Sequence, residues 1–119
     1  MSIDQARRTM DRYFALMGSG EDFAVCYRPD VTWSVVDTGE VIAGAAAVRA
    51  YVVALHASMV DSRTTAYVVG REHVYLEGDC AATDPRSDER TRYCVAYDIA
   101  DDGRISAMRG YGIGGRAHR

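Results

Sequence analysis

Tyrosine is the residue type in this chain with the most evident chemical potential, since the sequence holds eight tyrosines but only two phenylalanines and one tryptophan. A tyrosine side chain combines an apolar ring with a hydroxyl group that donates and accepts hydrogen bonds. Tyr51, Tyr93 and Tyr97 can therefore surround an oxygenated ring ligand with apolar walls and hydroxyl donors. The alternative is that these rings fill the hydrophobic core.

Histidine and cysteine are the other residue types that could carry chemistry. The three histidines and three cysteines show no spacing typical of metal ligands, so the sequence predicts no metal site and no cofactor. His56 and His73 are expected at the surface or at the rim of a site. Cys26, Cys80 and Cys94 stand in apolar stretches without Cys-x-x-Cys spacing, which favours buried free thiols in a reducing compartment.

Composition limits the classes of partner. A length of 119 residues predicts a single domain over residues 1–119. The net charge of −3 and pI near 5.5 argue against a nucleic-acid partner, because phosphate binding needs a basic face. The longest apolar run, residues 41–48, is far shorter than the roughly 20 residues of a membrane span. With an amphipathic helix in place of a secretion signal at the start, we expect a cytoplasmic protein without membrane contact.

The first half of the chain predicts three helices. A first amphipathic helix begins at Ser2, which forms a capping box with Gln5, and ends at Gly18. A shorter second helix follows and ends at Pro29, and a third opens at Gly44. The apolar face of the first helix carries Ile3, Ala6, Met10, Tyr13, Phe14 and Met17. That of the third helix carries Val48, Tyr51, Val52 and Leu55.

The remaining segments predict strands. Residues 31–37 alternate, with Trp33, Val35 and Asp37 on one face, and residues 41–42 form a short strand. From residue 62 onwards we expect a long strand over 62–77 that bends at Gly70, a turn at 77–79, and a short strand at 80–83. After a hairpin loop at 84–90, strands over 91–100 and 104–113 are joined by a turn at 101–103. Helices early and strands late predict an α+β fold with the helices on one sheet face.

Several short strings resemble the nuclear transport factor 2-like superfamily, which includes ketosteroid isomerases and SnoaL-like cyclases. These strings are Arg12-Tyr13 with the Gly-Ser-Gly-Glu-Asp-Phe that follows, residues 29–33, residues 102–105 and residues 108–111. The resemblance covers about residues 3–113. It implies a cone-shaped, curved and mostly antiparallel sheet, packed on three helices and enclosing a pocket. Towards that pocket it places Tyr13, Trp33, Val35, Asp37, Tyr51, Tyr93, Val95, Tyr97, Met108 and Gly110.

The resemblance also implies catalytic roles. Tyr13 stands where ketosteroid isomerases hold an enolate oxygen with a tyrosine, although it can equally be one more residue of the helix's apolar face. Asp37, two residues beyond the base position at Val35, can serve as the base, or it can be an ordinary turn residue. Val95 replaces the family's carboxylic acid. Met108 and Gly110 replace the His and Asp of the cyclases.

Two functions follow from this reading. The first is a cofactor-independent acid–base enzyme, of the isomerase, cyclase or dehydratase type, acting on a small apolar oxygenated molecule such as a polyketide or a steroid. The alternative is a non-catalytic domain of the same fold that binds a small molecule or serves for dimerisation. By analogy with the family, a homodimer through the exposed sheet face is expected in either case.

Overall fold

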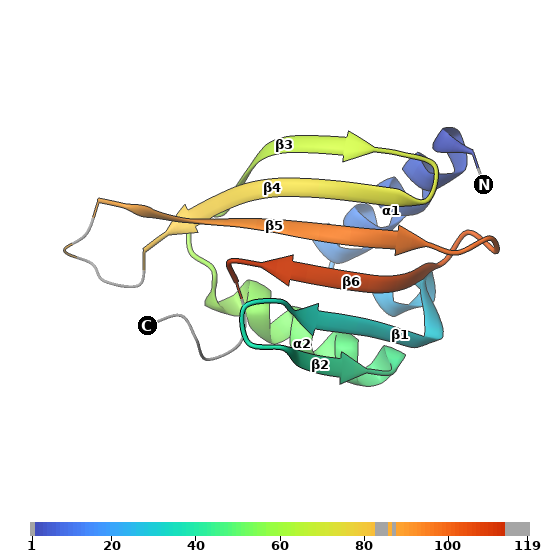
Figure 1. Cartoon of the computed structure of the whole chain (residues 1–119), viewed down its shortest axis with the longest axis horizontal. Coiled ribbons are helices and arrows are strands. Elements are labelled where there is room, and N and C mark those ends of the chain that lie inside the picture. Colours follow the sequence, from blue (N-terminus) through green and yellow to red (C-terminus); the bar gives the residue numbers. More distant parts are fainter. Residues whose placement is uncertain (1, 83–85, 87, 114–119) are drawn as a thin grey trace.

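The protein folds into two α-helices and one six-stranded sheet, described here from a computed structural model for residues 2–82, 86 and 88–113. Both helices lie behind the same face of the sheet (Figure 1). The predicted α+β architecture is confirmed. In chain order the elements are α1 (Ile3–Gly18), a 3₁₀ turn η1 (Phe23–Cys26), β1 (Tyr27–Val35), β2 (Glu40–Ala43), α2 (Ala45–Ser58), β3 (Arg63–Val69), β4 (His73–Ala81), β5 (Arg90–Ile99) and β6 (Ile105–Tyr111).

The sheet is curved, unclosed and mostly antiparallel. Its strands follow the order β2-β1-β6-β5-β4-β3, and β1 pairs with β6 in parallel while the other four pairings are antiparallel. The parallel pairing sets Trp33 beside Met108 and Val35 beside Gly110. Because paired residues point to the same face, this register decides which side of β6 faces the helices. Met108 and Gly110 face inward, a point that the apolar pattern of β6 alone leaves open.

Helix α1 forms as the sequence predicts. The Ser2 hydroxyl accepts a hydrogen bond from the Gln5 backbone N–H, and the Gln5 side chain accepts one from the Ser2 N–H, which completes the capping box. Ala6, Met10 and Tyr13 are the buried residues of the helix and hold it against the sheet. Within the described residues, no helix is long and apolar enough to cross a membrane.

The predicted second helix is replaced by the short 3₁₀ turn η1, so the helices number two and not three. The Asp22 carboxylate caps the turn by accepting the Ala24 N–H, and Tyr27 already belongs to β1, where it pairs with Ile105. Pro29 lacks a backbone N–H, which a helix interior needs but an irregular strand tolerates. A register shift between Tyr27 and Thr32 marks that irregularity.

The predicted long strand over 62–77 is wrong, because the chain reverses at Gly70 and forms the β3–β4 hairpin. The Gly70 N–H donates to the His73 carbonyl at 2.8 Å and closes this turn. The expected turn at 77–79 is instead the middle of β4. There Asp79, on an inner strand, accepts hydrogen bonds from the guanidinium groups of Arg63 and Arg90. Of the predicted loop at 84–90, residues 84, 85 and 87 lie outside the described residues, and Arg90 already belongs to β5.

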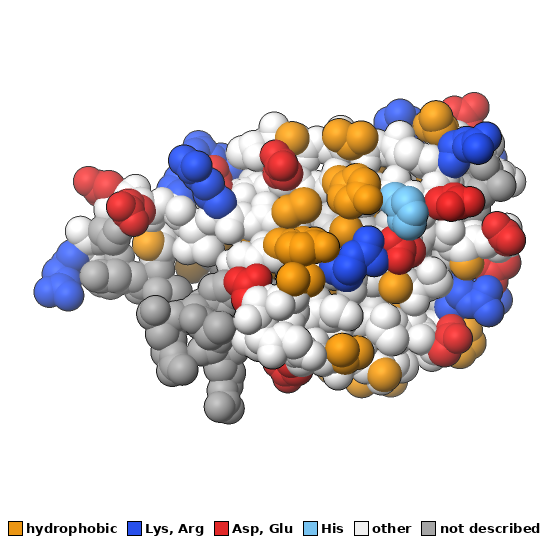
Figure 2. Space-filling model, viewed as in Figure 1, with side chains coloured by type: hydrophobic (Ala, Val, Ile, Leu, Met, Phe, Trp, Pro, Cys, Tyr) orange, Lys and Arg blue, Asp and Glu red, His pale blue; other side chains and the backbone are white. Residues whose placement is uncertain are grey.

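The outward face of the sheet is apolar at its centre (Figure 2). Val68 and Tyr75 pair across β3 and β4, and both are exposed, as is Tyr111 on β6. Beside them the Arg109 guanidinium forms a two-pronged ion pair with Asp98, at 2.8 and 3.0 Å. The homodimer through this face stays a prediction.

Replacing Tyr75 with glutamate tests that prediction. If two copies join through the apolar centre of the sheet, Tyr75→Glu places a charge in the contact and converts a dimer into a monomer. Light scattering coupled to gel filtration gives the mass of both proteins. The matched control is Val53→Glu, at an exposed apolar position on α2. A wild-type monomer, or a dimer broken equally by both substitutions, would contradict the expected interface.

Candidate ligand-binding and acid–base site

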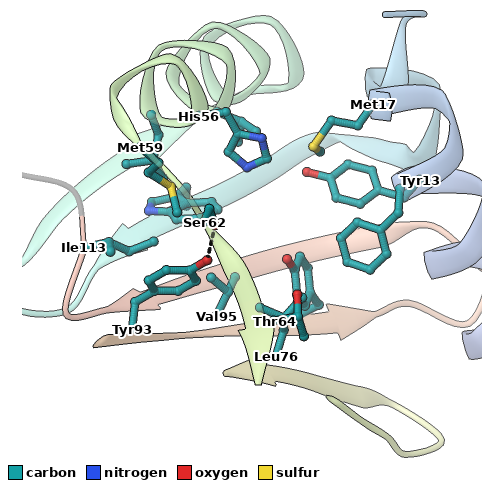
Figure 3. A pocket seen from close by; sticks show the side chains of 15 residues that line it. Tyr13, Met17, His56, Met59, Ser62, Thr64, Leu76, Tyr93, Val95 and Ile113 are labelled. Atoms are coloured by element: carbon teal, nitrogen blue, oxygen red, sulfur yellow. Dashed lines mark hydrogen bonds between the residues drawn. The ribbon is translucent and has the colours of Figure 1, made fainter. Parts of the chain in front are cut away.

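A cavity of about 260 Å³ lies between the two helices and the inner face of the sheet. Helix α1 contributes Tyr13, Phe14 and Met17, and these three positions fall on one face because a helix repeats every 3.6 residues. Helix α2 contributes Val52, Leu55 and His56 in the same manner. Figure 3 shows the two helices on opposite sides of the space, with the His56 ring and the Tyr13 hydroxyl directed towards each other.

Five of the residues predicted for the site line this cavity. They come from one helix and two strands whose alternation the sequence reveals. Their side chains share the inner side of the fold and form a wall that is mostly aromatic. The five are Tyr13, Trp33, Tyr93, Val95 and Tyr97.

Four predicted site residues lie elsewhere. Val35 and Met108 are fully buried in the core behind the wall, and Tyr51 packs its ring against Trp33 with centroids 5.5 Å apart. Asp37 is exposed in the turn between β1 and β2, where its Oδ1 accepts the Gly112 N–H at 3.2 Å. The expectation that Asp37 points into the pocket is therefore corrected, because β1 ends at Val35 and the chain has left the sheet two residues later.

The Tyr13 hydroxyl is a buried polar group of the cavity wall. It lies 2.7 Å from the Tyr27 hydroxyl, and either oxygen can donate in this hydrogen bond. Tyr27 is buried and does not line the cavity. Burial raises the pKa of both phenols well above the usual value of 10.0, so both stay protonated at every pH at which the fold is expected to persist. Tyr13 is therefore a neutral hydrogen-bond donor.

His56 provides a group at the cavity that can accept a proton. Its ring lines the space from α2 while part of the side chain remains exposed. Desolvation by the surrounding protein lowers the pKa of His56 below 6.5, since burial penalises the charged imidazolium. The ring is thus neutral near pH 7 and keeps one nitrogen lone pair available.

A second pair of hydroxyl groups lines another part of the wall. The Ser62 Oγ and the Tyr93 hydroxyl lie 2.7 Å apart, the hydrogen bond drawn as a dashed line in Figure 3. Ser62 belongs to the segment between α2 and β3, so this bond ties that segment to β5. Thr64, the second residue of β3, also lines the cavity.

Two glycines on the inner sheet face leave room for the aromatic rings. A Cβ at Gly110 would lie 2.8 Å from Cζ2 of Trp33, and a Cβ at Gly78 would lie 2.7 Å from the Tyr93 hydroxyl oxygen. Neither contact can form without displacement of the ring. The positions of Trp33 and Tyr93 in the cavity wall therefore depend on missing side chains on the neighbouring strands.

Sequence reasoning left out His56, Ser62 and Thr64 as cavity residues. The signal for His56 was available, because it follows Val52 by four residues and so shares the inward face of α2. Ser62 and Thr64 gave no such signal, since the expected strand over 62–77 hid the hairpin that sets their direction. Within the described part of the chain, no three His, Cys, Asp or Glu side chains gather as metal ligands.

The chain matches the family described as SnoaL-like domain over residues 7–108. A search of curated proteins gives no match.

Solved structures resemble the fold at low identity. A steroid delta-isomerase from Pseudomonas aeruginosa is 16% identical, with a TM-score of 0.78 over 90% of this chain and 78% of that chain. SalBIII, described as an epoxide hydrolase/cyclase-like enzyme in pyran ring formation in the polyether salinomycin, is 19% identical, with a TM-score of 0.67 over 91% and 90%. A de novo designed protein with a curved β-sheet is also 19% identical, with a TM-score of 0.73 over 95% and 88%. Because the same fold occurs in enzymes and in a designed protein, these similarities support the fold alone.

The dependence of the wall on its glycines can be tested with Gly110→Ala. The added methyl group should push the Trp33 ring out of place, lower the free energy of unfolding by about 1–3 kcal/mol and shift the emission of the single tryptophan. Urea denaturation followed by fluorescence measures both effects.

Gly18→Ala is the matched control, because a Cβ at Gly18 meets nothing within 4 Å. Its unfolding free energy should stay within roughly 0.5 kcal/mol of the wild type. A Gly110→Ala protein with wild-type stability and emission would show that the Trp33 ring is not fixed by this contact.

Proposed function

The chain belongs to the SnoaL-like domain family of the nuclear transport factor 2-like superfamily, and from this membership and its cavity we propose a cofactor-independent acid–base enzyme. Its substrate is a small, largely apolar molecule with a carbonyl oxygen. Tyr13 holds that oxygen, and His56 moves a proton at a neighbouring carbon. The observation that carries the proposal is the joint presence of a neutral donor and a neutral base in one apolar cavity.

The number of protons in the Tyr13–Tyr27 pair indicates that Tyr13 can donate a hydrogen bond to a ligand. Two phenols bring two O–H protons, and one of them lies between the two oxygens. For the other proton, the described residues offer the Tyr13 hydroxyl only the Met108 sulfur, at 4.0 Å, which is a weak acceptor. When Tyr27 donates to Tyr13, Tyr13 has a strong donor left for a ligand oxygen, and a ligand that supplies this oxygen favours that arrangement.

His56 acts as the base in this proposal, the role that the family resemblance suggested for Asp37. Among the described residues, no Asp or Glu lines the cavity, whereas the neutral His56 ring faces the space in which the substrate would lie. Removal of a proton beside a carbonyl moves the electron pair into an enolate, whose oxygen carries the new negative charge. A hydrogen bond from Tyr13 stabilises that charge, and the His56 imidazolium returns the proton to carbon.

Binding without catalysis is the second candidate, and the position of His56 favours it. The ring is partly exposed at the edge of the cavity, so it can simply border the opening. The two candidates differ in one measurable property, since only an enzyme accelerates the exchange of protons between a bound ketone and solvent. The cytoplasmic location stays a prediction in either case; the buried free thiols Cys26 and Cys80 agree with it.

Hydrogen–deuterium exchange of indanone, a small bicyclic ketone, tests catalysis without knowledge of the natural substrate. The protein should accelerate exchange at the carbon beside the carbonyl in D₂O, as measured by proton NMR. Tyr13→Phe should reduce the protein-dependent rate by roughly a hundred- to a thousandfold, and His56→Gln by about as much. Tyr75→Phe, on the outward sheet face, should leave the rate unchanged. Binding of indanone without acceleration would support the binding candidate, and absence of both would overturn the proposal.

The same rate should depend on pH in a defined direction. His56 acts as a base only when neutral, and burial holds its pKa below 6.5, so the protein-dependent rate should be lost as the pH falls below 6.5. At pH 7 and above, the rate should stay level up to the onset of Tyr13 ionisation, which burial moves well above 10.0. A rate that continues to rise between pH 7 and 9 would point to a different base.

A further inference from the structure

We infer that the substrate is uncharged, has a body of one or two rings, and carries a second oxygen at the end opposite its carbonyl group. This inference rests on the proposed function and narrows it from small apolar molecules in general to a size, a charge and an arrangement of polar groups. Three properties of the cavity carry it: its volume, the types of side chain in its wall, and the second hydroxyl pair.

The volume limits the size of the ligand. A cavity of about 150 Å³ in a protein interior accommodates one benzene molecule, so 260 Å³ corresponds to about ten non-hydrogen atoms. The cavity is also smaller than the roughly 300–1,000 Å³ of sites for drug-sized ligands. A fused two-ring molecule fits this space, whereas a four-ring steroid would extend well beyond it.

The types of side chain in the cavity wall indicate that the ligand is uncharged. Among the described residues that line the cavity, none is Asp, Glu, Lys or Arg, and the aromatic and aliphatic side chains that form most of the wall cannot replace the water around an ion. The charged neighbours of Ser62 along the chain are engaged elsewhere. Asp61 forms an ion pair with Arg90 at 2.9 Å, and Arg63 forms one with Asp79 at 2.8 Å. A carboxylate or an ammonium group on the ligand would therefore meet no side chain of fixed opposite charge among the described residues of the wall.

The Ser62–Tyr93 pair indicates the second oxygen. These two hydroxyl groups also bring two protons, of which one lies between them, so the pair retains a proton to donate and a lone pair to accept. Figure 3 shows the pair on the other side of the cavity from the Tyr13 hydroxyl, with Val95 between them on the sheet. A ligand held by Tyr13 at one end can thus place a hydroxyl or carbonyl oxygen against Ser62 and Tyr93 at the other.

A matched series of two-ring probes tests these properties by isothermal titration calorimetry. Indanone should bind more tightly than indane, which lacks the ketone. Hydroxyindanone, with the hydroxyl group on the ring far from the ketone, should bind roughly three- to tenfold more tightly than indanone. Indane carboxylate and androstenedione, a four-ring diketone, should both bind at least tenfold more weakly than indanone.

Variants of Ser62 and Tyr93 test whether these two residues bind the second oxygen of the ligand. Ser62→Ala and Tyr93→Phe should each remove most of the preference for hydroxyindanone over indanone, measured as the ratio of the two affinities within each variant. Tyr75→Phe is the control for Tyr93→Phe and should keep the preference. Because the comparison is made within each variant, a modest loss of stability does not affect it.

Each part of the inference has its own contrary result. Androstenedione binding as tightly as indanone would overturn the size limit, and binding of indane carboxylate would overturn the charge limit. An unchanged preference for hydroxyindanone in both variants would overturn the role of Ser62 and Tyr93. If none of the probes binds, the proposed function fails, and the inference fails with it. If indanone binds but hydroxyindanone binds no more tightly, only the inference about the second oxygen is refuted.

Discussion

The hydrogen bond between Tyr13 and Tyr27 is the interaction on which the rest of the structure most depends. Both tyrosines are buried and their hydroxyl groups satisfy each other through this bond, which fixes α1 against the start of β1. The rings of Phe14, Phe23 and Tyr97 surround Tyr13 with centroids 5.5–6.2 Å away. The cavity lies beside the helix held in this manner, with Tyr13, Phe14 and Met17 in its wall. The same bond thus serves packing and leaves a polar donor in an apolar space.

Aromatic rings on β1 and β5 and glycines on β4 and β6 together give the cavity its form. Trp33 occupies room above Gly110, and Tyr93 occupies room above Gly78. Each ring lies low on the sheet because its neighbour has no side chain, and the volume above the rings stays open. Large residues therefore line the cavity without filling it, which answers the question of whether these tyrosines act as wall or as core. Tyr93 and Tyr97 belong to the wall, whereas Tyr51 supports the wall from behind.

Local patterns in the sequence predicted the parts of the fold that local interactions determine. The Ser2 and Gln5 cap marked the start of α1, while the family resemblance placed Tyr13, Tyr93, Val95 and Tyr97 towards the pocket. What failed depends on distant partners. The Glu77-Gly78-Asp79 string has the composition of a turn, but Asp79 is fixed by arginines on both neighbouring strands, and Gly78 makes room for Tyr93. Asp37 shares the alternation of β1, and only the end of that strand at Val35 shows that its side chain has left the sheet.

The parallel pairing of β1 with β6 affects when the sheet can form during synthesis of the protein. During synthesis, α1, β1, β2 and α2 leave the ribosome well before β6, yet β1 obtains its second neighbour only when β6 arrives. Until then the inner faces of these early elements have no sheet to cover them, and such exposed apolar surface favours association with other chains. Contacts between residues so far apart along the chain also form slowly. The cavity, whose wall includes Tyr93, Val95 and Tyr97 of β5, can therefore form only after the later strands have been synthesised.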